Sequence, residues 1–134
     1  MKLLLDTHIL IRAMADDDLL SLQARKLIGE PSNEIFYSIV SPWEIEIKHQ
    51  KHPKEMPFDG RQIAQYAEMS GFHQVPVTID AIHALKTLER MQNTIDHKDP
   101  FDRIMICQAQ VNGMFLLTED ARISEYMNPC IITC

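Results

Sequence analysis

The segment KLLLDTHIL, residues 2–10, predicts a buried strand that ends in an acidic residue. Residues 2–5 form a predicted strand whose last three positions are consecutive leucines, which is typical of a parallel strand covered on both faces. Asp6 and Thr7 end this strand, and residues 8–14 favour a helix. Because a carboxylate beside a core is costly without a partner, Asp6 is expected either to cap the helix or to bind a cation.

The rest of the chain alternates between short apolar strands and helical segments. Further strands are predicted over residues 34–40, 72–77, 114–118 and 130–133, and further helices over residues 19–29, 41–51, 61–70, 80–92 and 100–112. Strands that alternate with helices favour a parallel sheet with helices on both faces. The 134 residues fit one domain, so we expect a single α/β domain over residues 1–134.

Composition and charge narrow the class of protein. The chain is 46% hydrophobic and 24% charged, which is typical of a soluble globular domain. It has no apolar run near the ~20 residues of a membrane span and no signal-like N-terminus. Cys107, Cys130 and Cys134 form no C-x-x-C motif, so we expect reduced thiols and a cytoplasmic location. The net charge of −6 disfavours a phosphate-binding surface, unless several acids surround metal ions.

Acidic residues recur where predicted strands give way to helices. Each of the four lies at a strand end or in the first turn of a helix: Asp6, Glu44, Asp102 and Asp120. Taken one at a time, these residues are best explained as helix caps. Ser41 and Glu44 match a capping box, Asp99 precedes Pro100 as an N-cap would, and either Thr118 or Asp120 suits the cap of the last short helix.

Taken together, the four acids favour a metal site. The carboxyl ends of parallel strands share one edge of a sheet, so these side chains are expected to converge there. Converging carboxylates repel one another unless cations neutralise them, and oxygen ligands suit Mg²⁺ or Mn²⁺ better than zinc. Such a site activates water and stabilises charge during phosphodiester cleavage. On this argument Asp6 is best explained as a metal ligand.

Four stretches resemble the PIN-domain ribonucleases, in particular the VapC toxins of toxin–antitoxin pairs. They are LLLDTHIL, SPWEIEIK, HKDPFDRIMICQAQ and LLTEDARI, and together they span nearly the whole chain. The resemblance implies a three-layer α/β/α sandwich with a central parallel sheet, and Mg²⁺-dependent cleavage of RNA, with tRNA as one suggested substrate. The family's acidic site then falls on Asp6, Glu44, Asp102 and Asp120. The implied partners are a second copy of the chain and a VapB-like antitoxin.

Several neighbours of the four acids are also candidates for the site. Thr7 and Thr118 could hold a metal-bound water or orient a carboxylate. Asp99 is mainly the cap, with a metal role as the alternative. Arg103 and His97 flank the site and could touch a substrate phosphate, although simple solvation is favoured for His97.

One basic cluster has two interpretations. It comprises Lys48, His49, Lys51, His52 and Lys54. It is either an edge that contacts RNA or the solvated end of a helix, and the sequence leaves both open. Two other functions also stay open: a PIN-like module that binds RNA or protein without cutting, and a housekeeping RNA-processing nuclease. Four carboxylates do not by themselves distinguish RNA from DNA.

Overall fold

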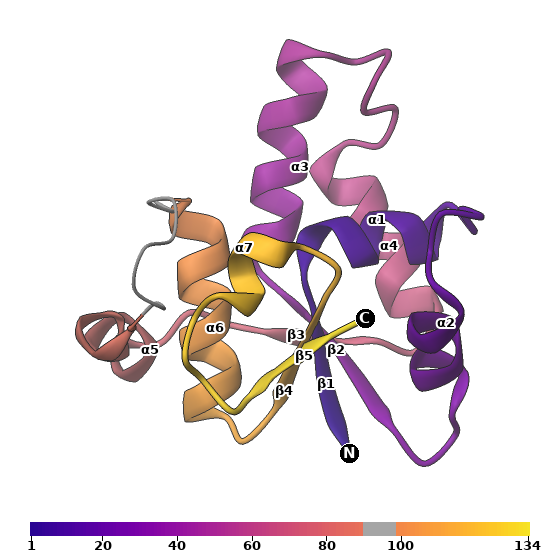
Figure 1. Ribbon diagram of the computed structural model, residues 1–134. Helices are drawn as coiled ribbons and strands as arrows, with labels where there is room; N and C mark the ends of the chain where they lie inside the picture. The colour runs from indigo at the N-terminus through magenta and orange to yellow at the C-terminus, as the bar shows by residue number, and fades with distance from the viewer. Residues whose placement is uncertain (90–98) are drawn as a thin grey trace.

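The computed structural model describes residues 1–89 and 99–134 and places a parallel sheet at the centre of the molecule (Figure 1). The strand order is β3-β2-β1-β4-β5, and every neighbouring pair is parallel. The strands are β1 (Lys2–Leu5), β2 (Glu34–Ser38), β3 (His73–Val75), β4 (Phe115–Thr118) and β5 (Ile131–Thr133). The predicted parallel sheet is therefore confirmed.

Helices cover both faces of this sheet, which completes the predicted α/β/α sandwich. They are α1 (Thr7–Met14), α2 (Leu22–Gly29), α3 (Val40–Lys51), α4 (Gly60–Met69), α5 (Ile79–Ala84), the 3₁₀ turn η1 (Leu85–Thr87), α6 (Pro100–Val111) and α7 (Ala121–Ser124). Side chains of α1, α2 and α4 enter one hydrophobic cluster, and those of α5, α6 and α7 enter the other. Helix α3 contributes Val40 to one cluster and Ile45 to the other.

Strand β1 shows why three consecutive leucines suit the middle of this fold. Successive side chains of a strand point to opposite faces of the sheet. Leu3 and Leu5 accordingly pack into the cluster beneath α1, α2 and α4, whereas Leu4 packs against α6. All three leucines are completely buried, because β1 lies between β2 and β4 with helices above and below.

The connections change direction between β1 and β4. From β1 the chain proceeds to β2 on one side, and from β4 it proceeds to β5 on the other. Ligands of open parallel sheets bind outside the carboxyl ends of the strands at such a switch. Asp6 directly follows β1, and its backbone N–H bonds to the carbonyl of Leu117 in β4 at 3.1 Å. The first predicted acid therefore lies at the switch point.

The predicted start of α3 is wrong by one residue, with consequences for the site. The helix begins at Val40, whose N–H donates to the Ser38 hydroxyl at 3.1 Å, and Ile39 supplies no side-chain cap. Ser41 therefore lies inside the helix, and its hydroxyl contacts Thr7 instead of the backbone. The capping box predicted for Ser41 and Glu44 does not form.

Two other helices also differ from the prediction. Ser21 caps α2, so Asp16–Asp18 precede the helix rather than open it. The helix predicted over residues 80–92 ends as α5 at Ala84 and tightens into η1, a common way for a helix to finish. Leu85 and Leu88 still pack against the core without a longer helix, and residues 90–92 lie outside the described part of the chain. Across the described residues, no helix combines the length and apolar character that a bilayer crossing needs.

Candidate metal centre

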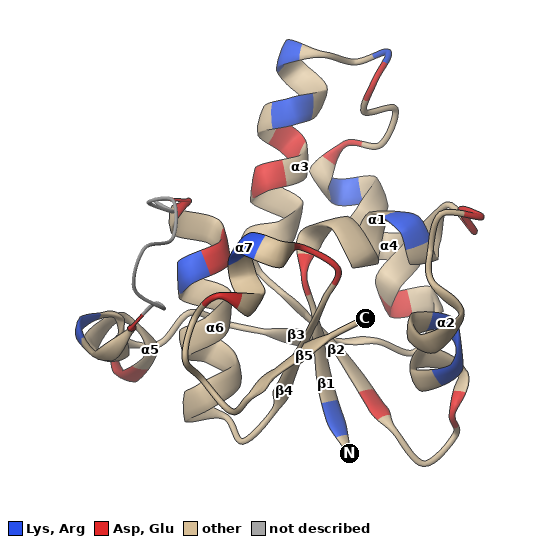
Figure 2. Cartoon of the chain, viewed as in Figure 1, with Lys and Arg blue, Asp and Glu red and all other residues tan. Residues whose placement is uncertain are grey.

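Four acidic residues lie at the carboxyl edge of the sheet or in the helices that start there, and Figure 2 colours the acidic positions of the chain red. Asp6 follows β1, Glu44 lies in α3, Asp102 lies in the first turn of α6, and Asp120 follows β4. Three of them are nearly buried, with Asp6 at 1% and both Glu44 and Asp102 at 7% exposure. These are the residues that sequence reasoning selected, although their role as metal ligands stays a prediction.

Asp6 both caps a helix and faces the neighbouring strand. One carboxylate oxygen accepts the backbone N–H of Ile9 at 2.8 Å, which caps α1. The other accepts a short hydrogen bond from the hydroxyl of Thr118 at the end of β4. Burial raises the pKa of Asp6, and these two hydrogen bonds oppose that increase. The sequence presented capping and metal binding as alternatives for Asp6, but the cap occupies only one of its oxygens.

The pKa of Asp102 reports how closely the acids gather. It is raised to about 8, chiefly by burial and then by the negative charges of Asp99, Glu44, Asp6 and Asp120. Asp99 caps α6, as expected, by accepting the N–H groups of Phe101 at 2.9 Å and Asp102 at 3.2 Å. Like charges at close range disfavour ionisation. The edge of the sheet therefore carries a concentration of negative charge that a cation would relieve.

Glu44 is the acid whose surroundings are least explained by capping. Its Oε1 atom is buried and has no hydrogen-bond partner within the described residues. Its Oε2 atom lies 3.9 Å from the Lys48 ammonium, the length of a loose ion pair. Leaving a buried carboxylate oxygen without a partner costs free energy. A ligand at this position would supply the missing partner.

Asp120 is turned towards its own helix. Its carboxylate caps α7 through the N–H of Arg122 at 2.8 Å and pairs with the guanidinium of Arg122 at 2.9 Å. The hydrogen bonds from Arg122 lower the pKa of Asp120, so this carboxylate stays ionised. Sequence reasoning missed this partner, although an arginine two residues beyond an N-cap is within reach of the capping side chain.

Two buried hydroxyl groups tie the starts of α1 and α3 together. The hydroxyls of Thr7 and Ser41 lie 2.9 Å apart and are both buried. Ser41 also contacts the sulfur of Met105 in α6 at 3.7 Å. Since Thr7 follows Asp6 and Ser41 precedes Glu44 by one helical turn, this contact fixes the two acids relative to each other. The sequence analysis selected Ser41 but interpreted its hydroxyl as a helix cap.

The other residues predicted to lie beside the four acids differ in their contacts. Arg103 donates to the hydroxyl of Tyr126 at 3.2 Å and lies 5.9 Å from the centre of its ring, so it anchors the segment after α7. Thr118 contacts Asp6 directly through its hydroxyl group. His97 lies outside the described residues, so its predicted place beside the site stays a prediction.

The candidate ligands are of the chemical type that a hard divalent cation prefers. Within residues 1–89 and 99–134, no three His, Cys, Asp or Glu side chains are grouped so that they could hold a metal ion as they lie. Thr118 and Arg122 engage two of the four carboxylates. All four candidate ligands are nonetheless oxygen donors, as Mg²⁺ and Mn²⁺ prefer, and Glu44 Oε1 has no other partner in the described structure.

Comparisons with known proteins agree with the fold. The family model described as "PIN domain" matches residues 3–128. Among solved structures, one similar chain comes from the crystal structure of VapBC2 from Rickettsia felis bound to a DNA fragment from their promoter. That chain has 15% sequence identity and a TM-score of 0.65, and the match covers 100% of this chain and 98% of the other. No curated protein matches this sequence.

Proposed function

Because this chain belongs to the PIN-domain family, we propose that it is an endoribonuclease that depends on Mg²⁺, with Mn²⁺ as a substitute. The observation that carries this proposal is the buried Glu44 oxygen without a hydrogen-bond partner, among acids that raise the pKa of Asp102 to about 8. A group of helix caps would leave no such oxygen. A carboxylate site for a cation accounts for both features.

The metal ligands in this proposal are Asp6, Glu44, Asp102 and Asp120. A bound divalent cation in such a site supplies an activated water and stabilises negative charge on the phosphate. The protein contributes the arrangement of the carboxylates. Thr118 holds one oxygen of Asp6, and the contact between Thr7 and Ser41 fixes the start of α3, which carries Glu44. Burial of Glu44 and Asp102 limits competition from bulk water.

We further propose that the chain is the toxin of a VapBC-type pair. The fold likeness to the Rickettsia felis VapBC2 structure, over the full length of this chain, supports this assignment. The proposal includes a VapB-like antitoxin, a homodimer and a cytoplasmic location, with structured RNA such as tRNA as the substrate.

The experiment that tests the function is cleavage of total RNA by the purified protein. It compares Mg²⁺, Mn²⁺ and EDTA for the wild type, Asp6→Asn, Glu44→Gln and Glu34→Gln. Glu34 is the matched control, because its exposed carboxylate lies at the first residue of β2, at the other end of the strands. Asn in place of Asp6 retains an oxygen that can accept the Ile9 N–H, so the cap is preserved.

We expect cleavage with either metal, none with EDTA, and a loss of more than about 100-fold in Asp6→Asn and Glu44→Gln, since even outer-shell partners of metal sites are worth 10–100-fold. Glu34→Gln should behave as the wild type. A folded wild type that binds Mn²⁺ but cuts no RNA would favour the binding module instead. Failure to bind Mn²⁺ would overturn the metal site and leave Asp6 and Asp120 as helix caps.

A further inference from the structure

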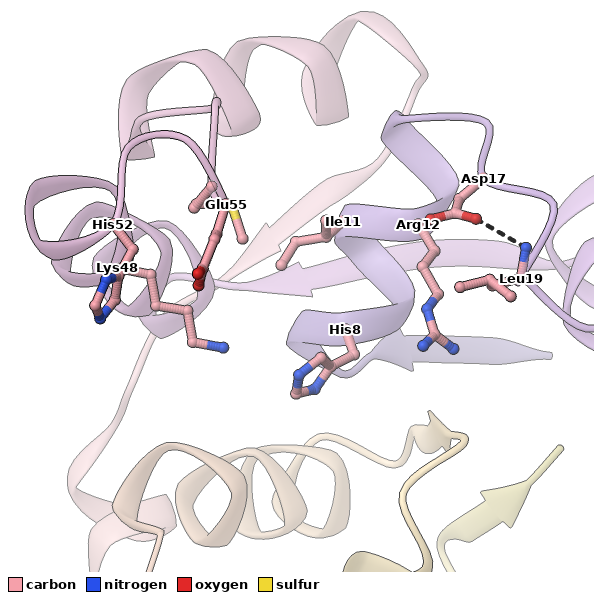
Figure 3. Close-up of a pocket in the computed structure, with 9 residues that line it drawn as sticks. His8, Ile11, Arg12, Asp17, Leu19, Lys48, His52 and Glu55 are labelled. Carbon is pink, nitrogen blue, oxygen red and sulfur yellow. Dashed lines mark hydrogen bonds between the residues drawn. The ribbon is translucent and has the colours of Figure 1, made fainter.

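A hollow of about 390 Å³ lies between α1 and the C-terminal end of α3 (Figure 3). Its lining includes His8 and Arg12 from α1, and Lys48 and His52 from the end of α3. Figure 3 shows the side chains of His8 and Lys48 extending towards the same open space from opposite sides. Four side chains that can donate hydrogen bonds to an anion therefore line one hollow, in a protein whose net charge is −6.

The hollow lies beside Glu44 and Asp6, although neither carboxylate lines it. The Lys48 ammonium is 3.9 Å from Glu44 Oε2. His8 lies two residues after Asp6, in the first turn of α1. Lys48 and His8 therefore connect the lining of the hollow to the acids at the sheet edge.

The structure separates the members of the basic cluster whose role the sequence left open. Lys48 and His52 line the hollow. His49 is used structurally, because its Nδ1 atom lies 2.8 Å from the carbonyl oxygen of Met56 and ties α3 to the following loop. Lys51 and Lys54 are exposed and do not line this hollow. Only part of the cluster therefore faces the route to the acids.

Two of the charged groups in the hollow are already committed to the protein. Arg12 pairs with Glu119 through a short contact, and Glu119 also accepts the N–H of Ser21 at 2.9 Å. Asp17 accepts the N–H of Leu19 at 2.8 Å. Lys48 differs, because its pair with Glu44 is loose and 41% of its side chain is exposed, so the pair contributes little free energy. Lys48 is thus available to a ligand.

Building on the proposed function, we propose that this hollow binds a backbone phosphate in an unpaired stretch of the RNA, next to the phosphate that is cut. Lys48 supplies the positive charge, His8 donates a ring N–H, and His52 lies further along the same hollow. An ammonium group has three donors for phosphate oxygens, and an imidazole has one N–H even when neutral. The site provides substrate placement, and Glu55, which also lines the hollow, opposes it by charge.

The test is binding of a fluorescein-labelled 12-nucleotide single-stranded RNA in EDTA, followed by anisotropy at several salt concentrations. The variants are Lys48→Met, Lys48→Arg, His8→Gln and Glu55→Gln. Lys51→Met is the matched control, because Lys51 lies on the same helix but outside the hollow. The Michaelis constant for RNA cleavage with Mg²⁺ is measured for the same variants.

We expect Lys48→Met to weaken RNA binding about 5- to 20-fold and to reduce the slope of log affinity against log salt by about 0.7, the value for one phosphate contact on a single strand. Lys48→Arg should restore the slope, His8→Gln should weaken binding at least two-fold, and Glu55→Gln should tighten it. Lys51→Met should change none of these. In cleavage, Lys48→Met should raise the Michaelis constant more than it lowers kcat.

The outcomes of this test are distinct from those of the proposed function. If the wild type cuts RNA but Lys48→Met binds RNA with unchanged affinity and salt slope, the proposal that the hollow binds a phosphate is wrong. A segment of a partner protein would then be the remaining ligand for the hollow. If the wild type never cuts RNA but Lys48→Met loses affinity and slope, the phosphate site stands and the nuclease assignment fails. Equal losses of RNA affinity in Lys48→Met and Lys51→Met would also overturn the phosphate site. They would show that RNA responds to the overall positive charge of the helix and not to a contact in the hollow.

Discussion

The hydroxyl of Thr118 joins two of the four acids across the switch point of the sheet. It donates a short hydrogen bond to one carboxylate oxygen of Asp6 and accepts the backbone N–H of Asp120 at 3.0 Å. Asp6 follows β1 and Asp120 follows β4, so a single buried side chain sets the position of both strand ends. The placement of the acids therefore depends on a residue that need not itself touch a metal ion.

Replacement of this hydroxyl should weaken the site more than the fold. We expect Thr118→Val, which keeps the side-chain shape, to lower RNA cleavage and Mn²⁺ affinity by about 10- to 100-fold, as for other residues that orient metal ligands. The loss of a partner for buried Asp6 should also cost about 1–3 kcal/mol of stability. Isothermal titration with Mn²⁺ and urea unfolding measure the two effects.

Thr118→Ser is the matched control for this prediction. Serine keeps the hydroxyl and loses one methyl group, so its metal affinity should stay within a few-fold of the wild type. Equal loss in the Val and Ser variants would show that the methyl group, and hence packing of β4, matters rather than the hydrogen bond.

The stability of the metal-free protein should fall as pH rises, because of Asp102. Burial and the neighbouring carboxylates raise the pKa of Asp102 from 3.8 to about 8 in the folded protein. Between these values the folded state holds a proton that the unfolded state has released, so stability is full below about pH 4 and decreases until about pH 8. Asp102→Asn removes this dependence.

In EDTA at pH 8 we therefore expect Asp102→Asn to be more stable than the wild type, by about 1–3 kcal/mol. At pH 5 the difference should shrink. Addition of Mg²⁺ at pH 8 should stabilise the wild type and leave Asp102→Asn nearly unchanged, which reverses the order. Thermal unfolding at both pH values measures this, and a less stable Asp102→Asn at pH 8 in EDTA would contradict it.

Close packing of α3 and α4 requires a glycine at the start of α4. A Cβ atom added at Gly60 would lie 2.5 Å from the carbonyl oxygen of Pro42, which is too near for any side chain. Gly60→Ala should therefore push α4 away from α3 and destabilise the protein by about 1–3 kcal/mol. At Gly29, near the end of α2, an added Cβ atom meets nothing within 4 Å.

Gly29→Ala is the control for this packing argument. It should leave stability unchanged or raise it by up to about 1 kcal/mol, because alanine favours helix over glycine. Urea unfolding of both variants gives the comparison. A Gly60→Ala variant as stable as Gly29→Ala would mean that α4 moves freely relative to the helix that carries Glu44.

The sequence predicted the layers of this fold well because burial leaves a clear pattern. Leu3, Leu4 and Leu5 are consecutive and apolar because β1 is covered on both faces, and that covering is what the structure shows. Helix starts were harder to predict. Where several serines lie near the start of a helix, the sequence does not show which of them is the cap. Ser38 serves the start of α3, whereas Ser41, which fits the capping motif, lies inside the helix against Thr7.

The candidate site could be predicted in position but not in detail. Strand ends share an edge, so the approach of Asp6 and Asp120 follows from the parallel sheet alone. The partner of each oxygen depends on side-chain conformation, which sequence spacing does not specify. The engagement of Asp120 by Arg122 and the unpartnered oxygen of Glu44 belong to this second class.

The pair between Asp120 and Arg122 leads to a prediction about metal affinity. Arg122 is 58% exposed, and its guanidinium lies 2.9 Å from the Asp120 carboxylate. If Asp120 is a metal ligand, this arginine competes with the cation for the same oxygens. An exposed pair of this kind is worth at most about 1 kcal/mol, so Arg122→Ala should tighten Mn²⁺ binding by up to about five-fold.

Isothermal titration with Mn²⁺ measures this effect, and salt provides an internal check. Because exposed ion pairs are screened, the difference between the wild type and Arg122→Ala should shrink as the salt concentration rises. Arg25→Ala is the control, since Arg25 pairs with Asp16 at 3.0 Å on the exposed turn before α2. Weaker Mn²⁺ binding in Arg122→Ala would assign the arginine the opposite role, in which it holds Asp120 in the orientation that the metal ion requires.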